Sequence, residues 1–128
     1  MAKDEDSNVR FFVARNYQTP SSGLADLAND DDPYVRKWVA AHRATPLETL
    51  AELAKDKNGT VRVEVAENPR ATPSLLALLA GDEDPWVRIS VAYNPSTPSE
   101  LLAAFAKSED EDERLRSLAE EKLAARKP

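Results

Sequence analysis

The stretch DPWVRISVAYNPSTPSELL, residues 84–102, restates a pattern that the chain has already presented three times. Twenty-six residues earlier, residues 58–76 read NGTVRVEVAENPRATPSLL, and residues 32–50 read DPYVRKWVAAHRATPLETL. The first copy is SNVRFFVARNYQTPSSGL, at residues 7–24. Four copies of one short unit predict a repeat architecture, in which each unit packs on its neighbours.

Three pairs of residues keep the copies in register. A Val-Arg pair recurs every 26 residues, at positions 9–10, 35–36, 61–62 and 87–88. A Thr-Pro pair follows it, at positions 19–20, 45–46, 72–73 and 97–98. An apolar pair comes next, at Leu24/Leu27, Leu50/Leu53, Leu76/Leu79 and Leu102/Phe105. The third copy has one extra residue before its Thr-Pro and one fewer after it, so the register is restored at once.

Each unit is predicted to form two short helices. An aspartate before a proline, as in Asp32-Pro33 and Asp84-Pro85, supplies an N-cap acceptor and a residue suited to the first helical position. We expect the first helix to end near a polar residue in each copy, at Asn16, His42, Asn68 and Asn94. We expect the Thr-Pro pairs to begin the second helix in the same way, with Glu48 and Glu100 completing a capping box.

Helices of roughly ten residues are unstable alone, so each must bury its apolar face on its neighbours. No segment alternates with a period of two over the length of a strand. The predicted fold is therefore all-α, a solenoid of about four 26-residue two-helix repeats. We divide the chain into a polar lead-in at residues 1–8, the repeats at 9–112 and a C-terminal capping helix at 113–128.

The pattern DPxVRxxVAxNPxTPxxLLxxLA, which residues 84–106 follow with Phe105 in place of the last leucine, resembles the leucine-rich repeat variant family over about residues 8–112. The resemblance implies a right-handed solenoid of alternating α-helices and short α or 3₁₀ helices, with no sheet. The second-best resemblance is to HEAT-like repeats. Both imply an interaction scaffold more often than an enzyme. Departures from the pattern are His42 for asparagine, Gly59 for proline, and a first unit without Asn-Pro.

The repeat decays after residue 106, and the last segment has the pattern of a capping helix. Leu115, Leu118, Ala119 and Leu123 form one apolar stripe at helical spacing. Five acids at 109–113 precede this helix, while Arg126 and Lys127 end it, the order that the helix dipole favours. We interpret the acidic run as a capping device. The alternative is a tail that binds a cation or a basic partner.

The composition bounds the function. The chain has 128 residues and a net charge of −6, which opposes docking on nucleic-acid phosphates. It lacks cysteine, which excludes thiolate metal sites and fits a cytoplasmic protein. The acidic start MAKDEDSN has no signal-peptide character, and no apolar run approaches the length of a membrane span. With one histidine, we expect no catalytic, metal or cofactor site, and so no enzyme.

One arginine recurs in every unit, at Arg10, Arg36, Arg62 and Arg88, and Arg114 keeps the same register in the capping helix. We interpret this row as a structural ladder, in which each guanidinium pairs with the acidic turn that precedes it. The turns in question carry Asp30/Asp32, Asp56 and Asp82/Asp84. The alternative is a row that grips phosphates or a partner's carboxylates, as in a HEAT-like protein that binds nucleic acid.

The first helices also carry large apolar side chains opposite their Val, Arg, Val and Ala positions. They are Phe11, Phe12, Tyr34, Trp38, Trp86, Ile89 and Tyr93. Because Tyr and Trp are typical of binding hot spots, we predict that this face binds a protein or peptide partner, or a second copy of the chain. The alternative is that the rings pack between units as core. A purely structural element of an assembly is a third class, which predicts self-association.

Overall fold

The computed structural model describes residues 6–16, 18–109 and 112–126. In chain order its helices are α1 (Ser7–Arg15), α2 (Ser21–Leu27), α3 (Pro33–Ala41), α4 (Leu47–Leu53), α5 (Gly59–Glu67), α6 (Pro73–Ala80), α7 (Pro85–Tyr93), α8 (Ser99–Lys107) and α9 (Glu113–Arg126). Within these described ranges the structure has no strand. The all-helical prediction is confirmed, and the second helices are α rather than 3₁₀.

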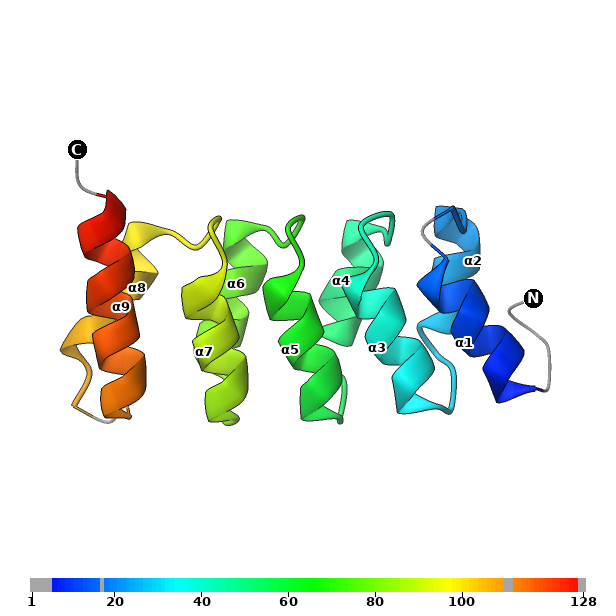
Figure 1. Ribbon diagram of the computed structural model, residues 1–128, viewed down its shortest axis with the longest axis horizontal. Helices are drawn as coiled ribbons and strands as arrows, with labels where there is room; N and C mark the ends of the chain where they lie inside the picture. Colours follow the sequence, from blue (N-terminus) through cyan, green and yellow to red (C-terminus); the bar gives the residue numbers. More distant parts are fainter. Residues whose placement is uncertain (1–5, 17, 110–111, 127–128) are drawn as a thin grey trace.

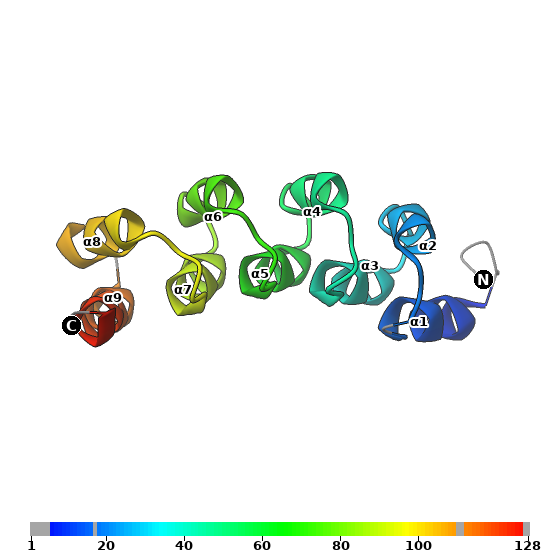
Figure 2. The same cartoon turned by 90° about the horizontal axis from the view of Figure 1, so that it is seen from above.

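The helices form two layers (Figures 1 and 2). The odd layer consists of α1, α3, α5, α7 and α9, each in contact with the next along the row. The even layer consists of α2, α4, α6 and α8, which pack mainly on helices of the odd layer. The sequence period therefore becomes a row of helix pairs that gives the protein an elongated shape.

The core runs between the two layers. The odd layer contributes valines that are fully buried: Val35, Val39, Val61, Val65, Val87 and Val91. The even layer contributes the repeated apolar pairs, of which Leu24, Leu50, Leu76 and Leu102 are also fully buried. Each such side chain contributes about 1.5–3 kcal/mol by leaving water. This burial stabilises helices that would be too short to persist alone.

The predicted ends of the first helices are confirmed. The side chains of Asp32 and Asp84 each accept a hydrogen bond at 2.9 Å from the N–H two residues on, and Asn58 does the same. Pro33 and Pro85 occupy the first turn. The C-caps are the predicted polar residues, Asn16, His42, Asn68 and Asn94.

The prediction that every Thr-Pro pair caps the second helix is wrong in three units. Helices α2, α4 and α8 begin after the proline and have no side-chain cap, so Glu48 and Glu100 do not complete a capping box. The threonine lies between helices, and its hydroxyl donates to a valine carbonyl of the first helix. These bonds are Thr19 to Val13 (2.6 Å), Thr45 to Val39 (2.5 Å) and Thr97 to Val91 (2.5 Å).

The third unit differs because of its extra residue. Ala71 is buried, in the place that threonine takes in the other units. Thr72 moves one position on, and its hydroxyl accepts from the Leu75 N–H at 3.2 Å. Helix α6 therefore has the threonine cap and the first-turn proline that the sequence predicted for all four units.

Helix α9 covers the last repeat. Leu115 and Ala119 are buried, and Leu118 and Leu123 pack partly buried against the same core. Arg126 donates to the Thr97 carbonyl at 2.6 Å, which ties the end of α9 to the connection between α7 and α8. Of the acidic run, residues 110–111 lie outside the described residues, and so does Lys127, which was predicted to end the helix. No helix in the described ranges has both the length and the apolar character to cross a membrane.

Candidate interaction surface

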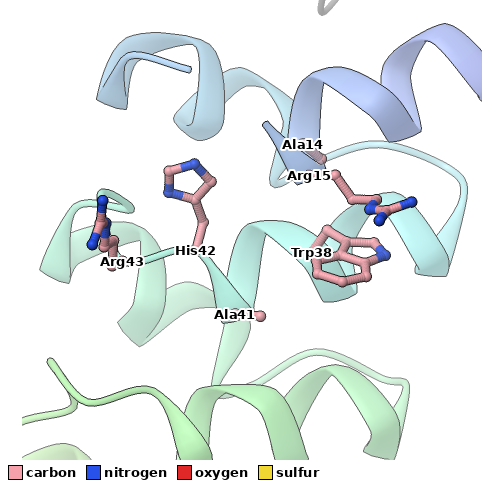
Figure 3. A pocket seen from close by; sticks show the side chains of 6 residues that line it. All are labelled: Ala14, Arg15, Trp38, Ala41, His42 and Arg43. Atoms are coloured by element: carbon pink, nitrogen blue, oxygen red, sulfur yellow. The ribbon is translucent and has the colours of Figure 1, made fainter. Parts of the chain in front are cut away.

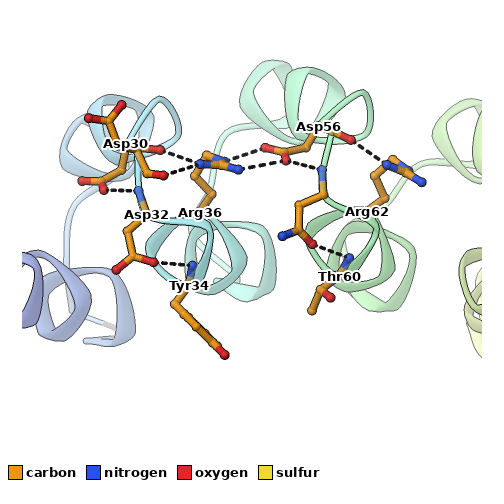
Figure 4. Close-up of polar contacts among 9 residues, drawn as sticks. Asp30, Asp32, Tyr34, Arg36, Asp56, Thr60 and Arg62 are labelled. Atoms are coloured by element: carbon orange, nitrogen blue, oxygen red, sulfur yellow. Dashed lines mark hydrogen bonds and ion pairs between the residues drawn. The ribbon is translucent and has the colours of Figure 1, made fainter.

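Arg36 and Arg62, two inner arginines of the row, each join two successive turns, and Figure 4 shows both contacts of Arg36. Arg36 donates from Nε and Nη2 to the Asp56 carboxylate, at 2.7 and 3.2 Å, and from Nη1 to the Asp30 carbonyl at 2.7 Å. Arg62 repeats this arrangement with the Asp82 carboxylate and the Asp56 carbonyl. A planar guanidinium suits this geometry because its N–H groups point in several fixed directions.

The predicted pairing with the preceding turn's carboxylate is wrong for Arg10, Arg36 and Arg62. The preceding turn supplies a main-chain carbonyl, and the carboxylate comes from the following turn, 20 residues on. Each carboxylate also accepts from the N–H two residues later at 2.9 Å, as Asp56 does from Asn58, which orients it. The signal was present in the sequence as Arg-Asp pairs at 10/30, 36/56 and 62/82.

These contacts lower the pKa of Asp56. Burial tends to raise the pKa of Asp56, but the Arg36 guanidinium and the Asn58 N–H outweigh it and lower that pKa below its usual value. Arg114, at the end of the row, differs from the others. It pairs with Asp112 of its own turn at 3.2 Å, and both side chains are exposed.

A second ladder, which the sequence reasoning missed, joins the C-terminal ends of the odd helices. The Asn68 side-chain amide donates to the carbonyls of Ala40 and His42, at 2.8 and 3.2 Å, and its oxygen accepts from the Arg70 N–H. Asn94 makes the same contacts with the carbonyls of Ala66 and Asn68. The feature of the sequence that could have predicted this second ladder is the asparagine that recurs at the C-cap position.

His42 takes the place of asparagine in this second ladder. Its Nδ1 accepts from the Ala44 N–H at 3.0 Å, so Nε2 carries the hydrogen and donates to the Asn16 carbonyl at 2.9 Å. Both ring nitrogens are engaged with the main chain. The interpretation of His42 as a polar substitute for asparagine is confirmed by these bonds.

The predicted binding residues all lie in the odd layer but divide into two groups. Four are more than half exposed: Phe12 (63%), Tyr34 (66%), Trp86 (59%) and Tyr93 (56%). Phe11, Trp38 and Ile89 are partly buried against the core. The interpretation as packing between units therefore applies to the second group, and binding of a partner stays a prediction for the exposed first group.

The partly buried rings form a cluster between α1 and α3. The Phe11 and Trp38 rings meet edge to face, with their centroids 6.0 Å apart. The Arg15 guanidinium lies over both rings, 5.2 Å from the Trp38 centroid and 5.7 Å from that of Phe11. Beside them is a groove of about 520 Å³, the N-terminal groove (Figure 3). It is lined by Ala14, Arg15, Trp38, Ala41, His42 and Arg43.

A second aromatic cluster lies between α7 and α9. The Arg114 guanidinium lies over the Trp86 ring at 5.7 Å, and the Lys122 ammonium lies over the Tyr93 ring at 5.0 Å. Cations of α9 thus cover one side of two exposed rings of α7. In each contact, a positive charge is attracted electrostatically to the face of an aromatic ring.

Helix α5, between the two clusters, carries acids in place of aromatic rings. Glu64 lies 4.0 Å from the Lys37 ammonium, measured from the carboxylate oxygen to Nζ. Burial raises the pKa of Glu64, the neighbouring Glu67 raises it further, and Lys37 opposes both. The face therefore has two aromatic clusters separated by a negative stretch.

Replacing Glu64 with glutamine is expected to stabilise the protein slightly at neutral pH. The raised pKa means that the folded state disfavours the charged carboxylate, so wild-type stability falls as the pH rises from the ordinary glutamate value through the folded-state value. Thermal unfolding of both proteins between acidic and neutral pH measures this. The melting curves should coincide in acid and separate near neutrality, and a lower melting temperature for the variant at neutral pH would contradict the expectation.

The described residues contain no group of three or more His, Cys, Asp or Glu side chains placed to hold a metal ion. Comparison with curated proteins and with solved structures found no significant match. A family model described as the Leucine Rich Repeat Variant domain matches residues 43–90. The central part of the chain thus matches the same family that its repeat pattern resembles.

Proposed function

We propose that this protein is a non-enzymatic scaffold that binds a protein or peptide through the aromatic side chains of its odd layer. The observation that carries the proposal is the exposure of four large rings, Phe12, Tyr34, Trp86 and Tyr93, on helices whose core positions are already filled. Exposed Tyr and Trp are the residue types that dominate binding hot spots. The Leucine Rich Repeat Variant match is consistent with a repeat scaffold. We also propose that the repeats form a right-handed solenoid of four units and that the protein is cytoplasmic.

The contacts of the arginine row favour a protein partner over nucleic acid. The guanidiniums of Arg10, Arg36 and Arg62 bind aspartate carboxylates of the chain itself. A phosphate would have to displace these carboxylates, whose paired geometry is among the stronger hydrogen-bonded arrangements. The net charge of −6 opposes such docking further.

Replacing Tyr34 and Trp86 together with serine is expected to abolish partner capture while the fold persists. Both rings are mostly exposed, so the melting temperature should change by no more than about 3 °C. The matched control replaces Leu47 and Leu78, exposed apolar residues of the even layer, with serine. Quantitative affinity capture with mass spectrometry identifies the partner, and light scattering shows whether it is a second copy.

Loss of capture should be confined to the odd-layer variant. Equal capture by both variants, or loss only in the even-layer control, would contradict the proposed surface. Loss of helical circular dichroism in the Tyr34/Trp86 variant would show instead that these rings stabilise the fold.

A further inference from the structure

Arg15 differs from the arginines of the ladder in what its guanidinium contacts. It is the last residue of α1, it is exposed, and it lies over the rings of Trp38 and Phe11. No hydrogen bond or ion pair joins its guanidinium to another described residue. Its side-chain N–H groups are therefore open to solvent beside the N-terminal groove, with the guanidinium carbon 5.2 Å from the centroid of the indole.

The other aromatic cluster shows the same pair with an acid added. Arg114 lies over Trp86 at 5.7 Å and also binds the Asp112 carboxylate at 3.2 Å. The Arg114 guanidinium and N–H hold the pKa of Asp112 below its usual value, so this carboxylate is charged near neutral pH. Between α7 and α9, one guanidinium thus contacts both a carboxylate and an indole. Between α1 and α3, the described residues bring together a guanidinium and an indole without a carboxylate bound to that guanidinium.

The lining of the N-terminal groove suits an anion beside an apolar group. None of the six lining residues is acidic, and two are arginines. Figure 3 shows the Arg15 guanidinium next to the Trp38 ring, with Arg43 on the far side of His42. His42 is committed to main-chain bonds on both ring nitrogens. Ala14, Ala41 and the indole supply the apolar part of the wall.

We infer that the N-terminal groove binds an acidic peptide segment. An Asp or Glu carboxylate of the peptide accepts from Arg15, and a neighbouring apolar side chain lies against Trp38. The inference rests on the proposed function and names its partner class. An exposed guanidinium held against an aromatic ring is already oriented, so less freedom is lost when a carboxylate binds.

A short acidic segment fits this surface better than a nucleic acid does. The next helix of the odd layer beyond α3 is α5, which presents Glu64 and Glu67. A phosphate backbone that continued along the layer would meet these carboxylates, whereas a peptide of a few residues occupies the groove alone. Like charges placed opposite each other disfavour the longer polyanion.

The test follows the two indole N–H signals of Trp38 and Trp86 by NMR, assigned with the Trp86→Phe variant. The probes are the blocked peptide Gly-Asp-Phe-Asp-Gly, its Gly-Asn-Phe-Asn-Gly analogue and hexathymidylate. We expect the acidic peptide at millimolar concentration to shift Trp38 and leave Trp86 in place. Arg15→Gln should weaken this binding about fivefold, as should the neutral analogue, while the control Arg114→Gln leaves it unchanged.

Three results would overturn the inference. They are equal shifts by the acidic and neutral peptides, unchanged affinity in Arg15→Gln, and a stronger response to hexathymidylate than to the acidic peptide. The two proposals can fail separately. If the acidic peptide does not bind, but the Arg15→Gln variant still captures a partner that the Tyr34/Trp86 variant no longer captures, the groove inference is wrong and the proposed function stands.

Discussion

Replacement of Arg36 by alanine is expected to lower the free energy of unfolding by about 3 kcal/mol, because it leaves a partly buried carboxylate without its cation. Arg36 and Asp56 are nearly covered, with side chains 8% and 9% exposed. The variant also loses the hydrogen bond to the Asp30 carbonyl. Urea unfolding followed by circular dichroism measures the change, and a fall of about 10 °C in melting temperature should accompany it.

Two further variants separate the cause from general disruption. Arg114→Ala removes an arginine whose ion pair is exposed, so it should change stability little. Arg36→Lys keeps the charge but loses the forked geometry, so it should fall between wild type and alanine. Equal, negligible losses for Arg36→Ala and Arg114→Ala would show that the inner arginines do not hold the units together.

The pH dependence gives a second readout of the same pair. The pKa of Asp56 is lowered in the folded state, so the stabilisation is present above the ordinary aspartate value of about 3.9 and is lost as the pH falls through the folded value. The difference in free energy of unfolding between wild type and Arg36→Ala should therefore become smaller as the pH falls. If this difference in free energy stays constant across the pH range, the loss comes instead from the packing of the aliphatic part of the Arg36 side chain.

Replacement of Asn68 by alanine is expected to cost about 2–3 kcal/mol, because it removes the partners of buried main-chain groups. The Asn68 side chain is buried and serves the carbonyls of Ala40 and His42 and the Arg70 N–H. The matched control is Asn16→Ala, since Asn16 is exposed and its side-chain oxygen accepts from the Gln18 N–H. Urea unfolding should show a clear loss of stability only for Asn68→Ala. Similar losses of stability in both variants would contradict the role of the buried asparagines in joining the units.

The two ladders act at opposite ends of the odd helices. The arginines lie in the first half of each helix and bind the turns that lead into it and into the next odd helix. The asparagines are C-caps and bind the preceding unit. Neighbouring units are therefore joined at both ends as well as through the core. Such a row holds its surface side chains in a defined arrangement, which reduces the entropy cost of binding.

Local sequence determined the helices and the core. The 26-residue period, the Asp-Pro and Asn-Pro pairs and the spacing of valines and leucines predicted where most helices begin and end and which positions are buried. These features act within one helix or its caps, over distances of about four residues along the chain. They do not depend on contacts with neighbouring units, so the sequence alone was enough to predict them.

Contacts between units were decided only by the tertiary structure. A helical pattern shows that Trp38 and Trp86 share a face, yet Trp38 is partly covered by Phe11 of α1 while Trp86 is 59% exposed. It shows that an arginine and an aspartate recur together, yet the carboxylate bound by Arg36 comes from the following turn. The distance and angle between adjacent helices set these partners, and those quantities depend on how whole units pack against each other.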